Sequence, residues 1–325
     1  MKHLIFLMLL FTGSAYAQQD ITLSSYRYPF DVSFLDFNSQ HLQLKMAYMD
    51  VQPPKSNGKT VVLLHGKNFN GAYWKTTIEA LSKEGYRVIA PDQIGFGKSS
   101  KPTGYQFTFQ QLAQNTKAVL DQLGIHKIEL LGHSMGGMVA VRFSLMYPGY
   151  VHKLILVDPL GLEDWKRLAP YASIDSNCKK EMKTDFAAAK KYQQENYYHG
   201  TWKPEYDEWV KLQTAWFGDP QYPVVAMDNA QTSDMIFTQP VVYELNLIKA
   251  PTLLIIGSLD RTAINRDLVK DPSVKAQMGQ YPQLAKQAQQ QIKGSQLVLI
   301  NGVGHLPQIE AFDRFIGPLK KFLMN

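Results

Sequence analysis

The hydrophobic residues of this chain recur with two different spacings, and the way the spacings alternate predicts the fold. Short segments that are apolar along their whole length are typical of strands buried on both faces of a sheet. Between them, apolar residues recur every three or four positions, as on the buried face of a helix. Strands that alternate with amphipathic helices indicate a parallel sheet covered on both faces. The predicted strands are residues 60–64, 87–90, 127–131, 153–157, 252–256 and 296–300.

Helical spacing fills the intervals between these strands, and a hairpin precedes them. Trp74, Ile78 and Leu81 fall on one face of the first predicted helix. Residues 42–48 alternate between apolar and polar after a polar turn, which predicts an antiparallel hairpin. Residues 275–293, rich in glutamine and alanine, predict a helix exposed to solvent. Further helices are predicted at residues 109–123 and 135–147, and over the apolar face of Phe312, Phe315, Ile316, Leu319 and Phe322.

The alternation of strands and helices stops between residues 162 and 245, where no buried strand is found. We interpret this segment as a helical cap inserted into a core made of residues 18–161 and 246–325. Most of the cap aromatics are expected to pack the cap on the core, and some to line an apolar pocket over the active site. These aromatics are Trp165, Trp202, Trp209, Trp216, Tyr171, Tyr192, Tyr197, Tyr198, Tyr206 and Tyr222.

The first 17 residues have the features of a removable secretory signal. Lys2 and His3 precede the apolar run 4–11, and Ala15-Tyr16-Ala17 matches the small-residue pattern of a cleavage site. The run is far shorter than the roughly 20 residues that span a bilayer. The protein is therefore expected to be exported, to the periplasm or the medium, after cleavage near Ala17, with no stable membrane span.

Composition excludes several other classes of protein. Cys178 is the single cysteine, so the chain has neither an intrachain disulfide nor a cysteine-based metal cluster. The net charge of +6 is spread along the chain without a basic stripe, which argues against nucleic-acid binding. No His-Glu-x-x-His run and no glycine-rich phosphate loop occurs, so neither a metal nor an organic cofactor is expected. The oligomeric state is left open.

A candidate nucleophile lies in Gly132-His133-Ser134-Met135-Gly136, between a predicted buried strand and a predicted helix. This context makes a G-x-S-x-G segment meaningful, because small residues allow the sharp strand-to-helix turn that exposes the serine hydroxyl. The next amide, that of Met135, then points at the oxyanion that forms during the reaction. His133 is held within the turn and is interpreted as shaping it.

A serine hydroxyl is a weak nucleophile and needs a base that is oriented by an acid. His305 follows the last predicted strand, and Asp260 follows the strand at 252–256. Catalytic groups of open α/β sheets gather at the carboxyl ends of strands. Asp158 follows the strand at 153–157 and competes for the role of the acid. We favour Asp260 over Asp158 as the acid.

The sequence resembles the α/β-hydrolase superfamily, in its capped serine-hydrolase branch. The resemblance rests on His65-Gly66, on Asp92 with the glycine-containing segment 95–99, on the serine segment, and on the acid and histidine loops. It implies a mostly parallel, doubly wound sheet of eight strands with the helical cap inserted after the sixth. It also implies the chain order serine, acid, histidine. The segment after Asp92 is assigned a structural role.

In this family the residue after the His-Gly pair supplies the second oxyanion amide, which implies this role for the backbone of Lys67. Asn68 contributes to the same loop or shapes it. Many relatives carry an aromatic residue, glycine or proline at these positions. An amide donor does not depend on its side chain, so the departure affects only the mouth of the pocket. Lys67 is interpreted as a solvated surface lysine, with attraction of an anionic substrate as the alternative.

These residues predict a carboxylesterase that hydrolyses a small or medium apolar ester through an acyl-enzyme. Three alternatives stay open: hydrolysis of a carbon–carbon bond in a diketone-like ring-cleavage product, an amidase or proline-type aminopeptidase activity, and a non-catalytic binding protein. Epoxide hydrolases and haloalkane dehalogenases attack through an aspartate, and Ser134 at that position argues against both activities.

Overall fold

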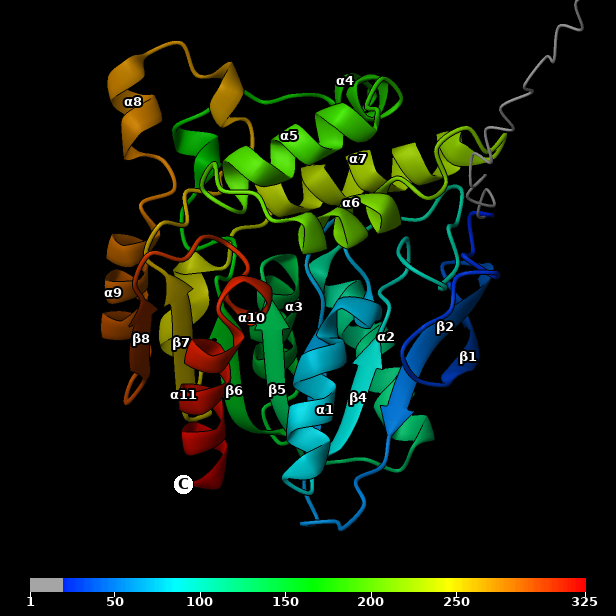
Figure 1. The fold of residues 1–325 in the computed structure, drawn as a ribbon, viewed down its shortest axis with the longest axis vertical. Coiled ribbons are helices and arrows are strands. Elements are labelled where there is room, and N and C mark those ends of the chain that lie inside the picture. Colours follow the sequence, from blue (N-terminus) through cyan, green and yellow to red (C-terminus); the bar gives the residue numbers. More distant parts are fainter. Residues whose placement is uncertain (1–19) are drawn as a thin grey trace, which may run out of the picture.

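The computed structural model describes residues 20–325, so the predicted signal segment at 1–17 lies outside the described residues. The chain forms one eight-stranded sheet in the order β1-β2-β4-β3-β5-β6-β7-β8 (Figure 1). The strands are β1 (Val32–Ser39), β2 (Leu42–Val51), β3 (Thr60–Leu64), β4 (Arg87–Pro91), β5 (Ile128–His133), β6 (Val151–Val157), β7 (Thr252–Gly257) and β8 (Gln296–Ile300).

The opening strands β1 and β2 pair antiparallel, and β2 also pairs antiparallel with β4. All other neighbours, from β4 through β3 to β8, run parallel. The apolar strands predicted from the sequence therefore form a mostly parallel sheet, and the predicted fold class is confirmed.

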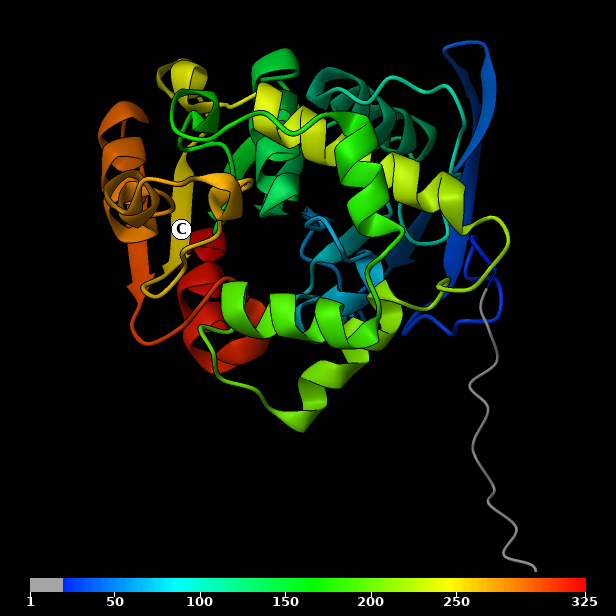
Figure 2. The ribbon, with the colours of Figure 1, turned by 90° about the horizontal axis from the view of Figure 1, so that it is seen from above.

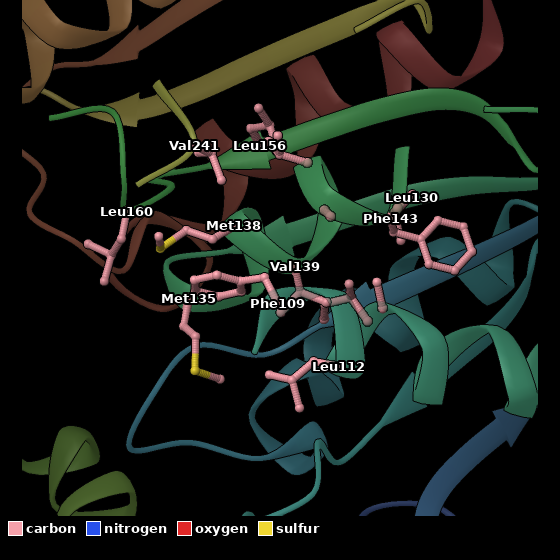
Figure 3. Close-up of a cluster of buried hydrophobic side chains, with 14 of the residues drawn as sticks. Phe109, Leu112, Leu130, Met135, Met138, Val139, Phe143, Leu156, Leu160 and Val241 are labelled. Atoms are coloured by element: carbon pink, nitrogen blue, oxygen red, sulfur yellow. The ribbon is translucent and has the colours of Figure 1, made fainter. Parts of the chain in front are cut away.

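Both faces of the sheet are buried, which is why its central strands are apolar throughout. Val61 and Leu63 of β3 belong to one core cluster, whereas Val62 and Leu64 belong to the other. The first cluster is covered by α1 (Lys75–Lys83) and α11 (Phe312–Met324), and the second by α2 (Phe109–Gln122), α3 (Met135–Met146) and α9 (Tyr281–Gln291). Figure 3 shows part of the second cluster, where α2 and α3 meet the sheet.

Only helices and turns connect β6 to β7, as the sequence pattern predicts. Figures 1 and 2 place this insertion beyond the carboxyl ends of β5 and β7. The boundaries at 162 and 245 that we assign to the cap stay a prediction. No helix among residues 20–325 is long and apolar enough to cross a bilayer. The elements of the insertion are η2 (Trp165–Arg167), α4 (Ile174–Glu181), α5 (Phe186–Asn196), η3 (Pro204–Tyr206), α6 (Asp207–Gln213), α7 (Tyr222–Thr238) and η4 (Val242–Leu247).

The expectation of one exposed helix over residues 275–293 is wrong. The segment divides into α8 (Pro272–Gln277) and α9, with Gly279 at a positive φ of 68° between them. A side chain at Gly279 would press on the backbone carbonyl of Arg261, so the break favours glycine. Helix α9 buries Tyr281, Ala285 and Ala288 against the sheet. The buried face of α9 consists largely of alanine, which gives a weak apolar pattern in the sequence, and the many glutamines make the whole segment look polar.

Candidate active site

Ser134 lies at the sharp turn between β5 and α3. Its backbone has φ 56° and ψ −121°, a conformation that is strained for any residue with a side chain. A Cβ on Gly132 would overlap the carbonyl oxygen of Gly136, and a Cβ on Gly136 would overlap that of Leu64. Both glycines of the predicted G-x-S-x-G turn are therefore required by close backbone contacts, and the turn holds the serine at the edge of the sheet.

Ser134, His305 and Asp260 form a continuous hydrogen-bonded chain. The Oγ of Ser134 lies 2.9 Å from Nε2 of His305, and Nδ1 of His305 lies 2.7 Å from Oδ2 of Asp260. The amide of Thr262 donates to the other carboxylate oxygen of Asp260 at 2.8 Å. A carboxylate only accepts, so Nδ1 carries the proton and Nε2 is free to accept the hydroxyl proton of Ser134. The structure thus brings together the serine, acid and histidine predicted from three separate loops.

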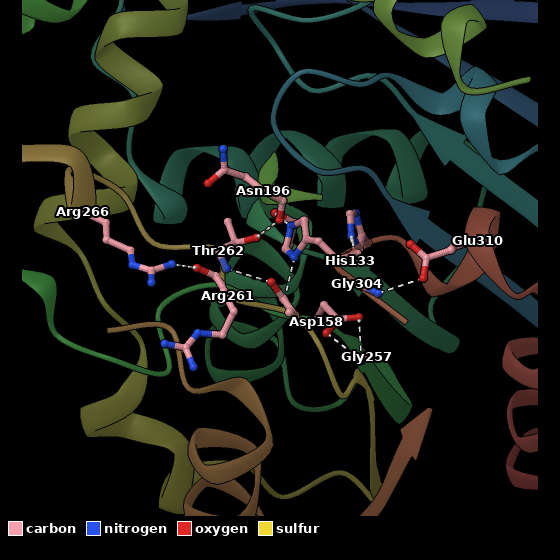
Figure 4. A network of polar contacts seen from close by, with 12 residues as sticks. His133, Asp158, Asn196, Gly257, Arg261, Thr262, Arg266, Gly304 and Glu310 are labelled. Carbon is pink, nitrogen blue, oxygen red and sulfur yellow. Dashed lines mark hydrogen bonds and ion pairs between the residues drawn. The ribbon is translucent and has the colours of Figure 1, made fainter. Parts of the chain in front are cut away.

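Asp158 lies beside this chain, but the two imidazole nitrogens of His305 are bonded to Asp260 and Ser134 instead. Its carboxylate accepts from the amide of Gly257 at 2.9 Å (Figure 4). The side chain of Asp158 is fully buried next to Asp260. Burial first, and then the neighbouring charge of Asp260, raise the pKa of Asp158 well above its usual range. This shift favours the neutral form of Asp158, which can donate a hydrogen bond to Asp260.

Ligand atoms of Asp158, Asp260 and His305 lie within 4.8 Å of one another, a grouping that could in principle hold a metal ion. Their hydrogen bonds to one another, to Gly257 and to Thr262 already account for the grouping. The raised pKa of Asp158 also disfavours metal binding, because a carboxyl ligand must be deprotonated. The donor set therefore fits an acid–base chain better than a metal site.

The loop after β3 brings Lys67 and Asn68 to the same place. Lys67 and Ser134 line one cavity, and Met135 is the first residue of α3, so its amide has no acceptor within the helix. The Nζ of Lys67 lies 3.3 Å from Oδ1 of Asn68 and 3.4 Å from the carboxylate of Glu181 in α4. The side chain of Lys67 is only 12% exposed. The interpretation of Lys67 as a solvated surface lysine is wrong, because the cap covers it.

His133 connects the loops after β3, β5 and β8. Its Nε2 lies 2.8 Å from the carbonyl oxygen of His305, and its Nδ1 lies 3.0 Å from the hydroxyl of Tyr73. That hydroxyl accepts from the amide of Gly66 at 3.1 Å. The carbonyl only accepts, so Nε2 is the protonated nitrogen and Nδ1 accepts from Tyr73. Burial lowers the pKa of His133 well below its usual range, which keeps the ring neutral in this role.

The segment after β4 is organised by Asp92, in agreement with the structural role assigned to it. The carboxylate of Asp92 accepts from the hydroxyl of Tyr28 at 2.7 Å and from the amides of Gly71 and Lys98 at 2.7 and 2.8 Å. These bonds fold the loop around the buried side chain of Asp92.

A cavity of about 600 Å³ lies between the core and the insertion, with Ser134 in its wall. Of the cap aromatics, only Tyr192 and Tyr197 are among its lining residues. Most of the others pack inside the protein, such as Tyr198 and Tyr206, whose rings stack with centroids 3.9 Å apart. The cavity is more polar than expected. Its charged lining residues are Lys67, Lys180, Glu181, Lys191, Glu195, Arg266, Asp267 and Lys275.

Comparison with known proteins gives the family of this chain. Residues 59–177 match the alpha/beta hydrolase fold family. The structure of a probable hydrolytic enzyme from Pseudomonas aeruginosa is 48% identical to this chain, with a TM-score of 0.91 over 93% of this chain and 97% of that protein. The chain belongs to the α/β-hydrolase family. The matched family segment contains Ser134, whereas Asp260 and His305 of this α/β-hydrolase lie beyond it.

Curated relatives of this α/β-hydrolase have different activities. Lipase 1 of Psychrobacter immobilis is 29% identical over 273 residues, which cover 82% of this chain and 77% of the lipase. A 2-hydroxy-6-oxononadienedioate/2-hydroxy-6-oxononatrienedioate hydrolase of Paraburkholderia phymatum is 39% identical over 118 residues, which cover 35% of this chain and 40% of that hydrolase. The chain spans only about two fifths of the length of the first curated relatives that it matches.

Several residues of this α/β-hydrolase site were not foreseen from the sequence. Thr262 follows Asp260 by two positions, and the short Asp-x-Thr spacing is a local signal for an amide that binds the carboxylate. Tyr73 and Glu181 carry no such signal, and Tyr197 is predicted only as one of the cap aromatics, without a place beside His305. They reach the site only through tertiary packing, from η1 (Gly71–Trp74) and from the insertion.

Proposed function

We propose that this protein is a serine hydrolase that transfers an acyl group from a carboxylic ester to water. The observation that carries the proposal is the chain of hydrogen bonds from Ser134 through His305 to Asp260, at 2.9 and 2.7 Å. In this chain a hydroxyl, a base and a buried carboxylate stand in the order that acyl transfer needs. Membership of the α/β-hydrolase family supports it.

The first half of the reaction forms an acyl-enzyme. Nε2 of His305 takes the hydroxyl proton as Oγ of Ser134 attacks the ester carbonyl. The resulting imidazolium is stabilised by the carboxylate of Asp260, and His305 then gives the proton to the leaving alkoxide, which departs as the alcohol. The C–O bond of the ester is broken, and the acyl group is bound to Ser134.

The second half of the reaction releases the acid. His305 takes a proton from a water molecule, which attacks the acyl-enzyme, and returns that proton to Oγ of Ser134 as the acid leaves. In both halves the amides of Met135 and Lys67 are assigned to the oxyanion. A single donor of this kind contributes roughly 10²- to 10³-fold in rate.

The cavity suggests the kind of ester that is hydrolysed. Its volume of about 600 Å³ suits a small or medium substrate. Its lining combines Leu160, Ile236 and Tyr192 with charged residues, so we propose an ester with an apolar part and a polar or ionic group. Residues 1–17 are the basis for proposing that the enzyme works outside the cytoplasm.

Hydrolysis of a carbon–carbon bond is the second candidate. Its support is the 39% identity to the 2-hydroxy-6-oxononadienedioate hydrolase, whose name denotes a substrate with two carboxylates. Lys67 lines the same cavity as Ser134 and would suit such a charge. In this reaction water adds across the bond next to a ketone, and the same hydrogen-bonded chain would move the protons.

The proposed function is tested by labelling and turnover together. Intact protein is treated with a fluorophosphonate probe and assayed on p-nitrophenyl esters of increasing acyl length and on a ring-cleavage diketone. Ser134→Ala is expected to abolish labelling and to reduce kcat by about 10⁴- to 10⁶-fold. Ser144→Ala is the matched control, because Ser144 is a buried serine of α3 that only bonds the carbonyl of Ala140. Full activity of Ser134→Ala, with no labelling of the intact protein, would falsify the proposal.

A further inference from the structure

Tyr197, the residue directly after α5, is packed against His305. Its backbone carbonyl accepts from the amide of His305 at 2.8 Å. Its ring is stacked on the imidazole with centroids 5.2 Å apart and planes inclined by 29°. Tyr197 is only 5% exposed, so bulk solvent has little access to the contact. A residue of the insertion thus supports both the backbone and the ring of the proposed base.

The approach of the two segments depends on the residue before His305. A Cβ on Gly304 would overlap the carbonyl oxygen of Tyr197. The amide of Gly304 is meanwhile held by the carboxylate of Glu310 at 2.9 Å. The histidine loop is therefore shaped to receive this carbonyl from the insertion.

The same short segment also reaches the loops after β3 and β7. The side-chain amide of Asn68 donates to the phenol oxygen of Tyr197 at 2.9 Å. The hydroxyl of Thr262 donates to the carbonyl of Asn196 at 3.3 Å, while the amide of Thr262 holds Asp260. Asn196 and Tyr197 therefore contact three loops that carry the proposed oxyanion amide, acid and base.

The stacked ring suits the charge that His305 acquires. When His305 takes the proton from Ser134 it becomes an imidazolium, and a cation close to the face of an aromatic ring is attracted by that ring. The centroid distance of 5.2 Å lies within the range of this attraction. The neighbouring Tyr198 makes no such contact, because its ring stacks on Tyr206.

We propose that Tyr197 is a positioning residue of the hydrolase, through which the cap holds His305 in line with Ser134 and Asp260. The inference rests on the proposed function of this chain. It implies that the site is competent only while Asn196 and Tyr197 are docked on the histidine loop, so the cap takes part in catalysis as well as in enclosing the substrate.

The kinetic test compares Tyr197→Leu, Tyr197→Phe and the matched control Tyr198→Phe on p-nitrophenyl acetate. Tyr197→Leu is expected to lower kcat by about 10- to 100-fold, the effect of a small misplacement of a catalytic group. KM should change much less, because acetate fills little of the cavity. Tyr197→Phe keeps the ring and should lose far less, and Tyr198→Phe should match the wild type. An unchanged kcat for Tyr197→Leu, or a change in KM alone, would show that Tyr197 only lines the cavity and would overturn the proposal.

A spectroscopic test does not depend on turnover. The imidazole N–H between His305 and Asp260 is followed by proton NMR of protein with ¹⁵N-labelled histidine, and His305→Gln assigns its signal. The signal is expected in the wild type and in Tyr198→Phe, and to be broadened by exchange in Tyr197→Leu. If Tyr197→Leu does not fold, Gly304→Ala displaces the same carbonyl from the core side and should broaden the signal. A sharp, unshifted signal in a folded variant contradicts the proposal. A wild-type signal without labelling of Ser134 contradicts only the proposed function.

Discussion

The strand-end loops of the core and the inserted cap hold their polar groups in different ways. In the core, Ser134, His305 and Asp260 are bonded to one another, and Thr262 holds Asp260 through a backbone amide. Buried polar atoms without a hydrogen-bond partner among the described residues occur in both regions, but none of them belongs to Ser134, His305 or Asp260. Those of the cap are Gln193 Oε1, Tyr198 Oη, Tyr206 Oη, Trp216 Nε1 and both carboxylate oxygens of Asp228.

This difference shows how the two regions divide the work. An unpaired buried polar atom costs roughly 1–3 kcal/mol, so those of the cap lower the stability of the folded protein. Helix α4 of the cap has no buried residue at all. The core fixes the chemical groups by directional bonds, whereas the cap shapes the cavity and can vary without disturbing them, except at Asn196 and Tyr197.

The largest effect should come from the acid of the core. Asp260→Asn keeps the size of the side chain but favours the wrong tautomer of His305, so kcat on p-nitrophenyl acetate should fall by about 10⁴-fold. Asp158→Asn should keep activity within roughly fivefold, because an amide also donates a hydrogen bond to Asp260. Stopped-flow or steady-state kinetics of both variants decide the matter. A larger loss for Asp158→Asn than for Asp260→Asn would show that Asp158, after β6, is the acid and that the assignment to Asp260 is wrong.

The next effect concerns stability of the cap and depends on pH. Burial raises the pKa of Asp228, on α7, to about 8, and the charge of Lys101 opposes this shift. The pKa of Asp228 is higher in the folded than in the unfolded protein. Its contribution to stability is therefore fully present below about pH 4 and is lost as the pH rises to about 8. Asp228→Asn cannot ionise, so its melting temperature should exceed that of the wild type by an amount that grows over this window. Near pH 8 its free energy of unfolding should be higher by about 1–3 kcal/mol.

Thermal melts at each pH measure this effect on Asp228. Desolvation lowers the pKa of Lys101 to about 7, and the charge of Asp228 opposes this shift, so Lys101 titrates in both proteins and at a lower pH in Asp228→Asn. Asp234→Asn is the control for loss of a carboxyl from α7, because Asp234 is only half-buried and bonds the hydroxyl of Tyr171. A stability difference that does not grow between pH 4 and pH 8 would remove Asp228 as the cause.

The smallest expected effect is on substrate choice. Glu181→Gln removes the partner of Lys67 and leaves a positive charge in the cavity beside Ser134. The ratio of kcat/KM for p-nitrophenyl hemisuccinate to that for the neutral p-nitrophenyl acetate should rise by about threefold to fivefold, the size of a partly exposed ion pair. Lys67→Met should lower the same ratio. High salt should reduce both changes. If neither variant changes the ratio, the charge of Lys67 lies too far from the bound ester to affect the choice of substrate.

The parts of the site that could be predicted from the sequence all lie at strand ends. Ser134 is marked by the glycines that its turn requires, and His305 and Asp260 follow apolar strands whose order the chain reveals. The environment of Lys67 could not be predicted in this way. Its cover comes from Glu181, more than 100 residues away along the chain, and short helices such as α4 owe their position to tertiary packing. The charged lining of the cavity escaped prediction for the same reason.

The contact of Tyr197 with the histidine loop has a consequence for the diversification of such enzymes. An insertion that only covered the active site could be exchanged between relatives, and each exchange would change the substrate specificity. Here a grafted insertion must also supply a carbonyl for the amide of His305 and a ring for its imidazole. Chimeras built on this core are therefore expected to inherit turnover only when the graft retains the junction at residues 196–197.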